Sequence, residues 1–160
     1  MRVVCNSTVL IALSRIGHLW LLEKLFGRLT IPAAVYNDVV VKGSGRPGAK
    51  DVAEARWIHV RKVRNVSVVE GLTSVLHQGE AEAIVLAREI GADLTILDDN
   101  LARETARIKE FNVTGTLALL RRAKEKGLIP ELKPLLDALR SARFYIGEEY
   151  DELLKDADEI

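Results

Sequence analysis

The sequence predicts an α/β fold, a three-layer α/β/α sandwich with a central parallel sheet of about five strands. Two observations support this prediction. Short apolar runs alternate with longer segments of helical periodicity, which is the pattern of strand–helix–strand units. The chain has 160 residues, 48% of them hydrophobic, which is enough to bury one core. We find no linker, and we expect a single domain over residues 1–160, in which 130–160 form a C-terminal helical extension.

In the first half of the chain, each predicted strand is a short β-branched or alternating run that is followed by a helical segment. Asn6, Ser7 and Thr8 form a turn and helix-start pattern after the first strand, and Pro32 suits the start of a later helix. The glycine-rich residues 43–48 predict a flexible loop. We expect strands at 2–5, 29–31 and 58–63, and helices at 9–16, 18–26, 33–41 and 49–56.

In the second half, apolar residues recur at helical spacing over 79–90, which predicts a strong helix. A short apolar run and a brief β-branched segment predict strands at 94–97 and 112–114. Further helices are expected at 100–111, 116–126, 131–142 and 148–154.

Composition limits the possible classes of protein. Lys and Arg together number 23, as do Asp and Glu, so a nucleic-acid site must come from local patterning and not from bulk charge. The single cysteine, Cys5, excludes an internal disulfide and a zinc site with several cysteines. No apolar stretch reaches the roughly 18–20 residues of a membrane span, and polar residues interrupt the apolar run near the N-terminus. We therefore expect a cytoplasmic protein without membrane contact.

The most informative segment is LTILDDN, at residues 94–100. Its apolar run predicts a buried strand that ends in two adjacent carboxylates, Asp98 and Asp99. The carboxyl ends of the strands line the ligand crevice of an open α/β sheet. Two neighbouring anions in that position repel each other unless a cation or a basic group compensates them. The segment therefore indicates a metal site.

Three more polar residues fall where they could reach the same crevice. Asn6 follows the first strand, Asp38 lies on the helix after the second strand, and Glu80 opens the helix before the fourth. If the strands at 2–5 and 94–97 are neighbours, these oxygen donors and the aspartate pair meet. A site made only of oxygens suits Mg²⁺ or Mn²⁺ rather than zinc. Such ions bind phosphate oxygens, so the expected chemistry is phosphodiester hydrolysis.

Several segments in consistent order resemble the PIN-domain ribonucleases, and especially the branch in which asparagine replaces the first acidic residue. The matching segments are 3–13, 31–38, 79–84, 97–100 with Arg103, and 113–117, and the resemblance runs over residues 3–129. It implies a three-layer α/β sandwich, a divalent metal and cleavage of single-stranded RNA. Many members of the family are toxins of prokaryotic toxin–antitoxin pairs, of the VapC type, which a partner protein inhibits.

The resemblance also implies roles for individual residues, and the predicted function is a metal-dependent endoribonuclease with a possible role as a toxin. The catalytic carboxylates would be Asp38, Glu80, Asp98 and Asp99. The ligands of Mg²⁺ or Mn²⁺ would be Asn6, Glu80, Asp98 and Asp99. The substrate-binding residues would be Ser7, Arg103, Thr114 and Thr116.

Two positions depart from the family pattern. Asn6 offers a metal an oxygen but no negative charge, and Asp38 is one methylene shorter than the usual glutamate. An alternative function therefore stays open, a catalytically weak or inactive PIN-like module that binds RNA or a protein partner. A phosphoacceptor receiver domain is disfavoured, because its acidic pair follows the first strand and the pair in this chain comes late.

The acidic candidates and Asn6 also have structural interpretations. Asp98 or Asp99 could cap the following helix, and Asn6 could be a turn residue. Glu80 could complement the dipole of the helix that it opens. We expect Glu82 to be a solvated neighbour of Glu80.

The substrate-binding candidates have structural interpretations as well. Arg103, Arg107 and Lys109 could contact an RNA backbone, or they could form ion pairs with Glu104 and Glu110 on the surface of their helix. Thr114 and Thr116 flank Gly115 ahead of a helix, where an anion site and an ordinary helix cap are both reasonable.

The last part of the chain carries an apolar stripe at helical spacing, formed by Leu132, Leu135, Leu136 and Leu139. The stripe could complete the core, or it could serve homodimerisation, which many relatives show. We expect a homodimer.

Overall fold

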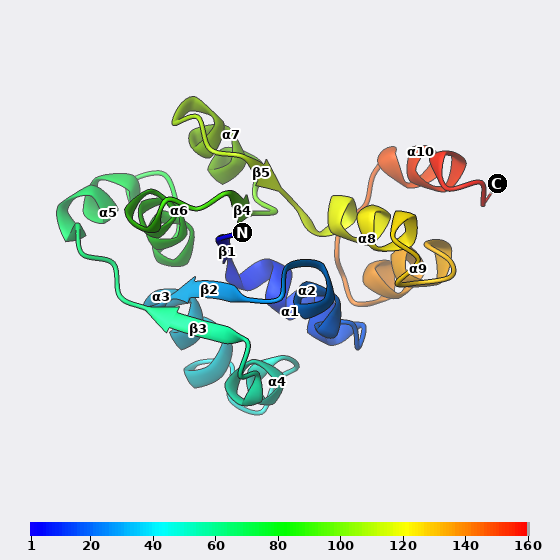
Figure 1. Ribbon diagram of the computed structural model, residues 1–160, viewed down its shortest axis with the longest axis horizontal. Helices are drawn as coiled ribbons and strands as arrows, with labels where there is room; N and C mark the ends of the chain where they lie inside the picture. Colours follow the sequence, from blue (N-terminus) through cyan, green and yellow to red (C-terminus); the bar gives the residue numbers. More distant parts are fainter. Residues whose placement is uncertain (160) are drawn as a thin grey trace.

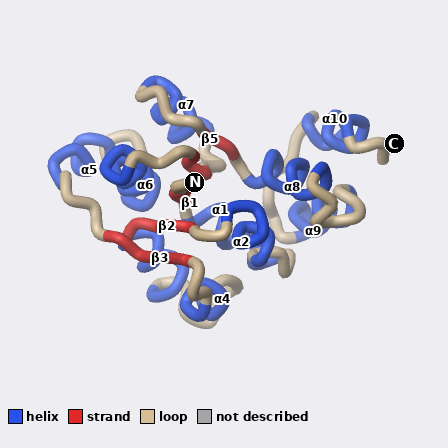
Figure 2. The backbone as a smooth tube through the Cα atoms, in the orientation of Figure 1, coloured by secondary structure: helices blue, strands red, loops and turns tan. Residues whose placement is uncertain are grey.

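The computed structural model describes residues 1–159 and contains a five-stranded, all-parallel sheet with the order β3–β2–β1–β4–β5. The strands are β1 (Val3–Cys5), β2 (Leu29–Pro32), β3 (Ile58–Arg61), β4 (Leu94–Ile96) and β5 (Val113–Thr114). Helices lie on both faces of the sheet (Figures 1 and 2), which confirms the predicted α/β/α sandwich. The domain predicted over 1–160 includes Ile160, which lies outside the described residues.

The helices follow the predicted order, with ends that differ by a few residues. They are α1 (Ser7–Arg15), α2 (Trp20–Phe26), α3 (Ala33–Tyr36), the π-helix η1 (Asn37–Val41), α4 (Ala49–Glu54), α5 (Val66–Leu72), α6 (Gln78–Ile90), α7 (Asn100–Ile108), α8 (Thr116–Glu125), α9 (Lys133–Ser141) and α10 (Glu149–Asp156). Two features were not predicted. The helix expected over 33–41 changes to π-helical geometry at Asn37, and α5 has no counterpart among the predicted elements.

Helix α5 forms although its sequence, VSVVEGL, is rich in β-branched valine and so has a weak helical pattern. Its first turn is capped by Asn65, whose Oδ1 accepts a hydrogen bond from the Val68 N–H. Val69 is buried in the core cluster that α6 also lines. Packing against α6 therefore overrides the local preference.

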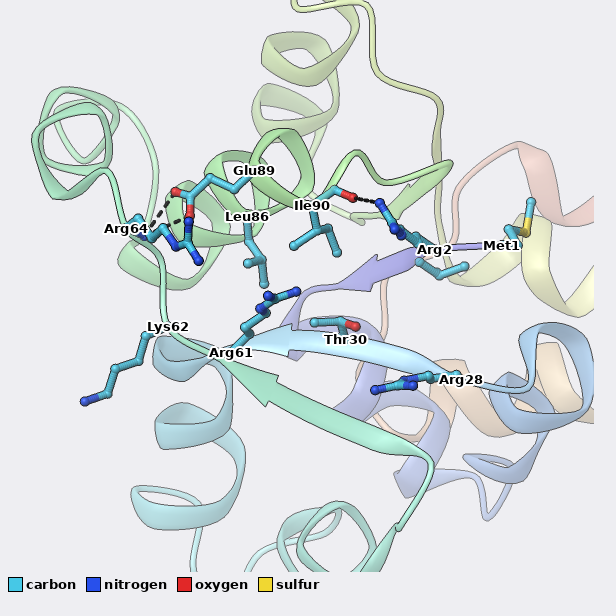
Figure 3. A pocket seen from close by; sticks show the side chains of 11 residues that line it. Met1, Arg2, Arg28, Thr30, Arg61, Lys62, Arg64, Leu86, Glu89 and Ile90 are labelled. Carbon is cyan, nitrogen blue, oxygen red and sulfur yellow. Dashed lines mark hydrogen bonds between the residues drawn. The ribbon is translucent and has the colours of Figure 1, made fainter.

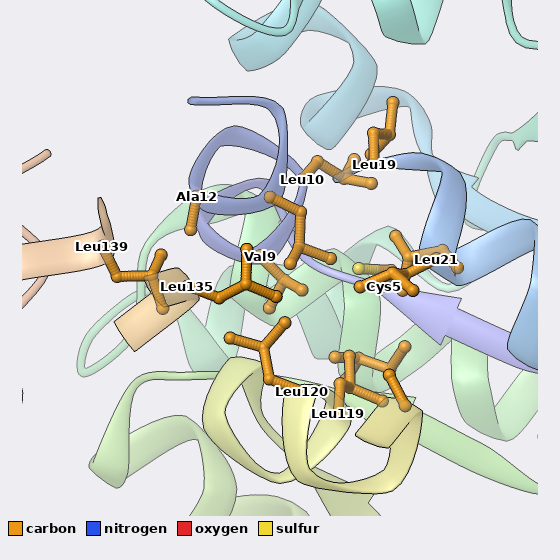
Figure 4. Close-up of a cluster of buried hydrophobic side chains, with 14 of the residues drawn as sticks. Cys5, Val9, Leu10, Ala12, Leu19, Leu21, Leu119, Leu120, Leu135 and Leu139 are labelled. Carbon is orange, nitrogen blue, oxygen red and sulfur yellow. The ribbon is translucent and has the colours of Figure 1, made fainter. Parts of the chain in front are cut away.

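The sheet separates two apolar clusters because successive side chains of a strand point to opposite faces. Val3 and Cys5 of β1 face the larger cluster, which α1, α2 and α8 also line, whereas Val4 faces the cluster under α5, α6 and α7. Figure 4 shows Cys5 beside Leu21 of α2 in the larger cluster, to which leucines of α1, α8 and α9 also belong. The central strand is thus buried on both faces, as expected for a parallel sheet.

The leucine stripe of α9 belongs to this larger cluster. Its members are almost fully buried, with exposed fractions of 0% for Leu132, 8% for Leu135, 0% for Leu136 and 0% for Leu139. The stripe therefore completes the core and does not form an open surface for a second copy.

The segment after α10 is tied back to α8 and α9. Glu159 accepts the backbone N–H groups of Leu132 and Lys133 and forms an ion pair with Lys124 at 2.6 Å. Figure 1 shows α9 and α10 gathered beside α8 at one end of the molecule, with α5 at the other end. Within residues 1–159, helices with the length and apolarity of a bilayer span are absent.

One polar link joins the end of β4 to the start of α8. Asp98 accepts the Thr116 N–H at 2.7 Å through Oδ1 and the Thr116 hydroxyl at 2.6 Å through Oδ2. Gly115 leaves the space that this link needs, because a Cβ atom at position 115 would lie 2.7 Å from Asp98 Oδ1 and 3.3 Å from the Leu97 carbonyl oxygen.

Gly115→Ala is therefore expected to lower the free energy of unfolding by about 1–3 kcal/mol, because its methyl group would overlap the pinned Asp98 carboxylate. The matched control is Gly71→Ala on α5, where an added Cβ meets no atom within 4 Å. The free energy of unfolding of this control should rise by about 0.5 kcal/mol, because alanine reduces the conformational freedom of the unfolded chain. Urea denaturation of both variants measures the difference, and equal stabilities would show that Asp98 moves aside at no cost.

Candidate functional site

The strand order places a ligand crevice between β1 and β4. The chain proceeds outward from β1 to β2 and β3, and then returns to the other side of β1 with β4 and β5. Open parallel sheets bind ligands outside the carboxyl ends of the strands at such a reversal. Asn6 directly follows β1, and Asp98 and Asp99 follow β4, which pairs with β1. The strands that carry these residues are neighbours, as the sequence reasoning required.

Asn6 is held in place from two directions. Its backbone N–H donates to the Ile96 carbonyl oxygen at 3.1 Å, which continues the pairing of β1 with β4. Its side-chain Oδ1 caps α1 by accepting the Ser7 N–H at 2.7 Å and the Ser7 hydroxyl at 3.2 Å. With an exposed fraction of 1%, Asn6 holds its amide oxygen in a fixed position at the carboxyl end of β1.

Asp38 reaches the same place from the π-helix η1. Gly79 is the second residue of α6, and a Cβ atom there would lie 3.1 Å from Asp38 Oδ2 and 3.6 Å from Asn6 Oδ1. The oxygens of both residues therefore approach the start of α6 through the gap that this glycine leaves. Lys42 lies 3.9 Å from Asp38 Oδ1, but both side chains are well exposed, so the ion pair holds the carboxylate only weakly.

Glu80 is the third residue of α6 and is 5% exposed. Its Oε1 accepts the His77 N–H at 3.1 Å, which caps the helix. Burial raises the pKa of this carboxyl, the hydrogen bond from His77 opposes the rise, and the negative charge of Asp99 adds to it. The structure thus brings Glu80 and Asp99 close enough to repel each other.

Asp98 and Asp99 point to different helices although they are adjacent in the sequence. Asp99 caps α7, since its Oδ1 accepts the Ala102 N–H at 2.8 Å. Asp98 turns to Thr116 at the start of α8, in the link described above. Burial raises the pKa of Asp98, whereas the hydrogen bonds from Thr116 and the charge of Arg103 lower it.

The four predicted substrate-binding residues lie along this edge and differ in their burial and hydrogen bonding. The Ser7 hydroxyl donates to Asn6 Oδ1, and the Thr116 hydroxyl donates to Asp98. Thr114 is half-buried at the end of β5. The Nε atom of Arg103 is buried and has no hydrogen-bond partner within residues 1–159.

The acids at this edge do not share a single point. Within the described residues, no three His, Cys, Asp or Glu side chains are grouped so that they could hold a metal ion. Instead, Glu80, Asp98 and Asp99 each accept a backbone N–H at the start of a different helix. The ligand set of Asn6, Glu80, Asp98 and Asp99 therefore stays a prediction.

Sequence reasoning gave the wrong surroundings for Glu82 and missed the role of two glycines. Glu82 is half-buried and not a solvated neighbour, because its Oε1 accepts the Ala34 N–H at 3.1 Å and its Oε2 accepts a bond from the Gln78 side chain at 2.8 Å. It ties α6 to the start of α3. Gly79 and Gly115 make room for the acidic side chains, and their positions within the motifs GEAEA and TGT were the available signal.

The raised pKa of Glu80 gives a test in the metal-free protein. Because the folded-state pKa is raised, this carboxyl favours folding below its ordinary pKa, and the contribution is lost as the pH rises through the raised value. Glu80→Gln should therefore stabilise the protein at pH 7, since the amide keeps an acceptor for the His77 N–H without a charge. The gain should vanish at pH 4.

Chemical denaturation in EDTA at the two pH values measures this effect. Asp151→Asn, on the exposed surface of α10, is the control for removal of a carboxylate. A gain of equal size at both pH values would contradict the assignment of Glu80 as a buried, destabilising charge.

The chain is similar to known proteins in sequence and in structure. A PIN-domain family model matches residues 2–159, which includes α9 and α10, beyond the segment 3–129 that carries the sequence motifs. Among solved structures, the chain is similar to a PilT N-terminus domain protein from the hyperthermophilic archaeon Sulfolobus solfataricus P2, with a TM-score of 0.48 and 21% sequence identity over 77% of this chain and 93% of that chain. No curated protein matches the chain. The match over almost the whole sequence shows that the chain belongs to the PIN domain family.

Proposed function

We propose that this PIN-domain chain is a metal-dependent endoribonuclease that cleaves phosphodiester bonds of single-stranded RNA. The observation that carries the proposal is that Asn6, at the end of β1, lies beside Asp38 and at the same edge of the sheet as Asp98 and Asp99, which follow the neighbouring strand β4. The negative charge of Asp99 also helps to raise the pKa of the buried carboxyl of Glu80. Among the described residues, His77 is the only basic group that counters this effect at Glu80. Like charges that the protein compensates only in part favour a cation from solution.

The ligands that we propose for Mg²⁺ or Mn²⁺ are Asn6, Glu80, Asp98 and Asp99, whose carboxylates would have to turn from the separate helix starts that they cap to meet at one ion. All are oxygen donors, which are the ligands that these ions prefer. Thr116 fills one acceptor position on each oxygen of Asp98, and a carboxylate offers about four, so Asp98 can still bind a cation. When bound, a divalent ion would lower the pKa of a water molecule and neutralise charge on the scissile phosphate.

Asp38 is the residue that we propose as the proton acceptor for the attacking water. It reaches the crevice beside Asn6, and 39% of its side chain is exposed, so a water molecule can reach its oxygens. Its weak pairing with Lys42 leaves the carboxylate free to accept a hydrogen bond. A carboxylate in hydrogen-bond reach of a water can act as a general base.

Arg103 supports the RNA part of the proposal. A buried donor without an acceptor costs about 1–3 kcal/mol, and a phosphate oxygen that accepts the bond from Arg103 Nε would remove this cost. Arg103 also lines a groove of about 590 Å³ together with Arg121, Tyr145 and four carboxylates, those of Asp98, Glu149, Glu152 and Asp156. Tyr145 is 86% exposed, and its ring offers a surface on which an unpaired base can stack.

Two finer parts of the proposal rest on the family resemblance, namely a toxin role with an antitoxin protein as inhibitor, and a homodimer. A cytoplasmic location is proposed from the composition of the chain. Because the leucine stripe of α9 is buried in the core, a dimer would form through another surface.

Asp99→Asn is expected to reduce Mn²⁺-dependent cleavage of single-stranded RNA by at least about a hundredfold. The fold should persist, because asparagine caps a helix as well as aspartate does. Asp151→Asn is again the matched control and should cleave like the wild type. Cleavage is followed on an end-labelled RNA with Mn²⁺ and with EDTA. Full activity of Asp99→Asn, or cleavage that survives EDTA, would contradict the proposal.

A second candidate function, a catalytically weak or inactive module that binds RNA or a protein partner, is favoured by Asn6. Its amide oxygen already accepts two bonds from Ser7 and carries no charge. For a nuclease, Asn6→Asp should tighten Mn²⁺ binding by about tenfold, because added ligand charge raises the affinity of an oxygen site. Calorimetric titration measures this change. If neither protein binds Mn²⁺ or cleaves RNA, and the wild type still binds single-stranded RNA or a protein partner, the result favours the binding module.

A further inference from the structure

We call the edge of the sheet that carries Asp38, Glu80, Asp98 and Asp99 the acidic edge. A second polar cavity lies away from it, between α6 and the β2–β3 part of the sheet. It has a volume of about 610 Å³. Arg28 precedes β2, and Arg61 ends β3, where it pairs in register with Pro32. Figure 3 shows Arg61 and Thr30 between the sheet and α6, with Arg28 beside β2. We call this cavity the basic pocket, after its cationic lining residues Arg2, Arg28, Arg61, Lys62 and Arg64.

The basic pocket carries a local charge that the chain does not balance. The one acidic residue that lines it, Glu89, accepts the backbone N–H groups of Arg64 and Asn65 through its carboxylate. Within residues 1–159, the ion pairs involve none of the cations that line the pocket. Arg2 Nη1 donates to the Ile90 carbonyl oxygen at 2.6 Å (Figure 3), and among the described residues the other cations have no ion-pair partner. In a chain with a formal net charge of zero, this concentration of cations fits an anion supplied from outside.

The side chains define what kind of anion fits. Most of the cations are arginines, whose guanidinium groups bind phosphate oxygens in a bidentate manner. None of the described lining residues is aromatic, so the pocket offers no ring on which a base could stack. Several separate cations around one large cavity suit consecutive phosphates better than a single one. The chemistry is therefore that of a phosphodiester backbone.

Helix α6 connects the basic pocket to the acidic edge. Glu80 lies at the acidic edge and Glu89 lines the basic pocket. The rise of 1.5 Å per residue in an α-helix separates these two positions by about 14 Å. A few nucleotides of extended RNA span such a distance. One strand can therefore occupy both places.

We propose that the basic pocket is a second contact for single-stranded RNA, which binds backbone phosphates remote from the scissile bond. The proposal rests on RNA as the substrate in the proposed function. Binding through phosphates alone makes the contact independent of base sequence and sensitive to salt. The acidic edge would then receive a strand that the basic pocket already holds.

The test measures binding without cleavage. Fluorescence anisotropy in EDTA gives the affinity of a labelled 20-nucleotide RNA for the wild type and for Arg28→Gln/Arg61→Gln. Both arginines are exposed, so the double variant should melt like the wild type. We expect at least about tenfold weaker binding, equally for oligo-U and oligo-A. The slope of log K against log salt should fall by about 1.4, because two phosphate contacts are lost.

Lys126→Gln, an exposed neutralisation at the end of α8, is the control and should bind RNA like the wild type. Unchanged affinity in the double variant would overturn the proposal. It would also be overturned if ATP bound as tightly as the RNA and competed with it, which would assign the pocket to a small phosphorylated ligand. A further contradicting outcome is a wild-type dimer that dissociates as salt is added and that the double variant does not form, while the two proteins bind RNA equally well. That outcome would assign the basic pocket to acidic residues of a second copy of the chain.

The outcome separates this proposal from the nuclease proposal. If the double variant loses affinity but the wild type cleaves no RNA, the basic pocket stands and the nuclease assignment fails. If the wild type cleaves RNA and the double variant binds normally, the nuclease assignment stands and the basic pocket fails.

Discussion

The parallel pairing of β1 with β4 is the interaction on which the rest of this structure depends. Three residues of each strand pair in register, and the backbone N–H of Asn6 extends the ladder to Ile96. Because β1 is central and buried on both faces, a shift of β1 by one residue relative to β4 would point Val4 away from the cluster under α5, α6 and α7 and into the larger cluster. The same shift would move Asn6 away from the loop that carries Asp98 and Asp99. Core packing therefore fixes the geometry of the polar edge.

Helix starts are the second organising feature of that edge. The side chain of Asn6 caps α1, and carboxylates accept N–H groups at the starts of four other helices, namely Glu82 at α3, Glu80 at α6, Asp99 at α7 and Asp98 at α8. The N-terminal ends of helices carry partial positive charge, which stabilises nearby anions. This arrangement explains how several acids gather at one edge without a basic partner for each. The field of the helices supplies part of the compensation.

Much of the fold and part of the site could be predicted from the sequence. Alternating strand and helix patterns gave the sandwich, and the segment at 94–100 identified the strand end that Asp98 and Asp99 follow, beside the end of β1. Helix α5 was missed because valine-rich residues form it only when Val69 can pack into the cluster beside α6. The capping role of Glu82 and the contacts at Gly79 were also missed, since both depend on which helix starts lie side by side. Local patterns show where polar groups occur along the chain, but tertiary packing decides what each of them contacts.

The capping role of Asp99, combined with the metal-binding role that we propose for it, has a consequence for the dynamics of α7. Its Oδ1 atom holds the first turn of this helix through Ala102, so any ligand that draws the carboxylate away leaves that turn uncapped at a cost of about 1 kcal/mol. Site occupancy and fraying of α7 are then thermodynamically linked, and a mutation that loosens the helix would alter the affinity of the crevice without touching it. The exposed apolar side chains of Leu101 and Ile108 lie on this same helix. A protein that covers them would act on the crevice from outside.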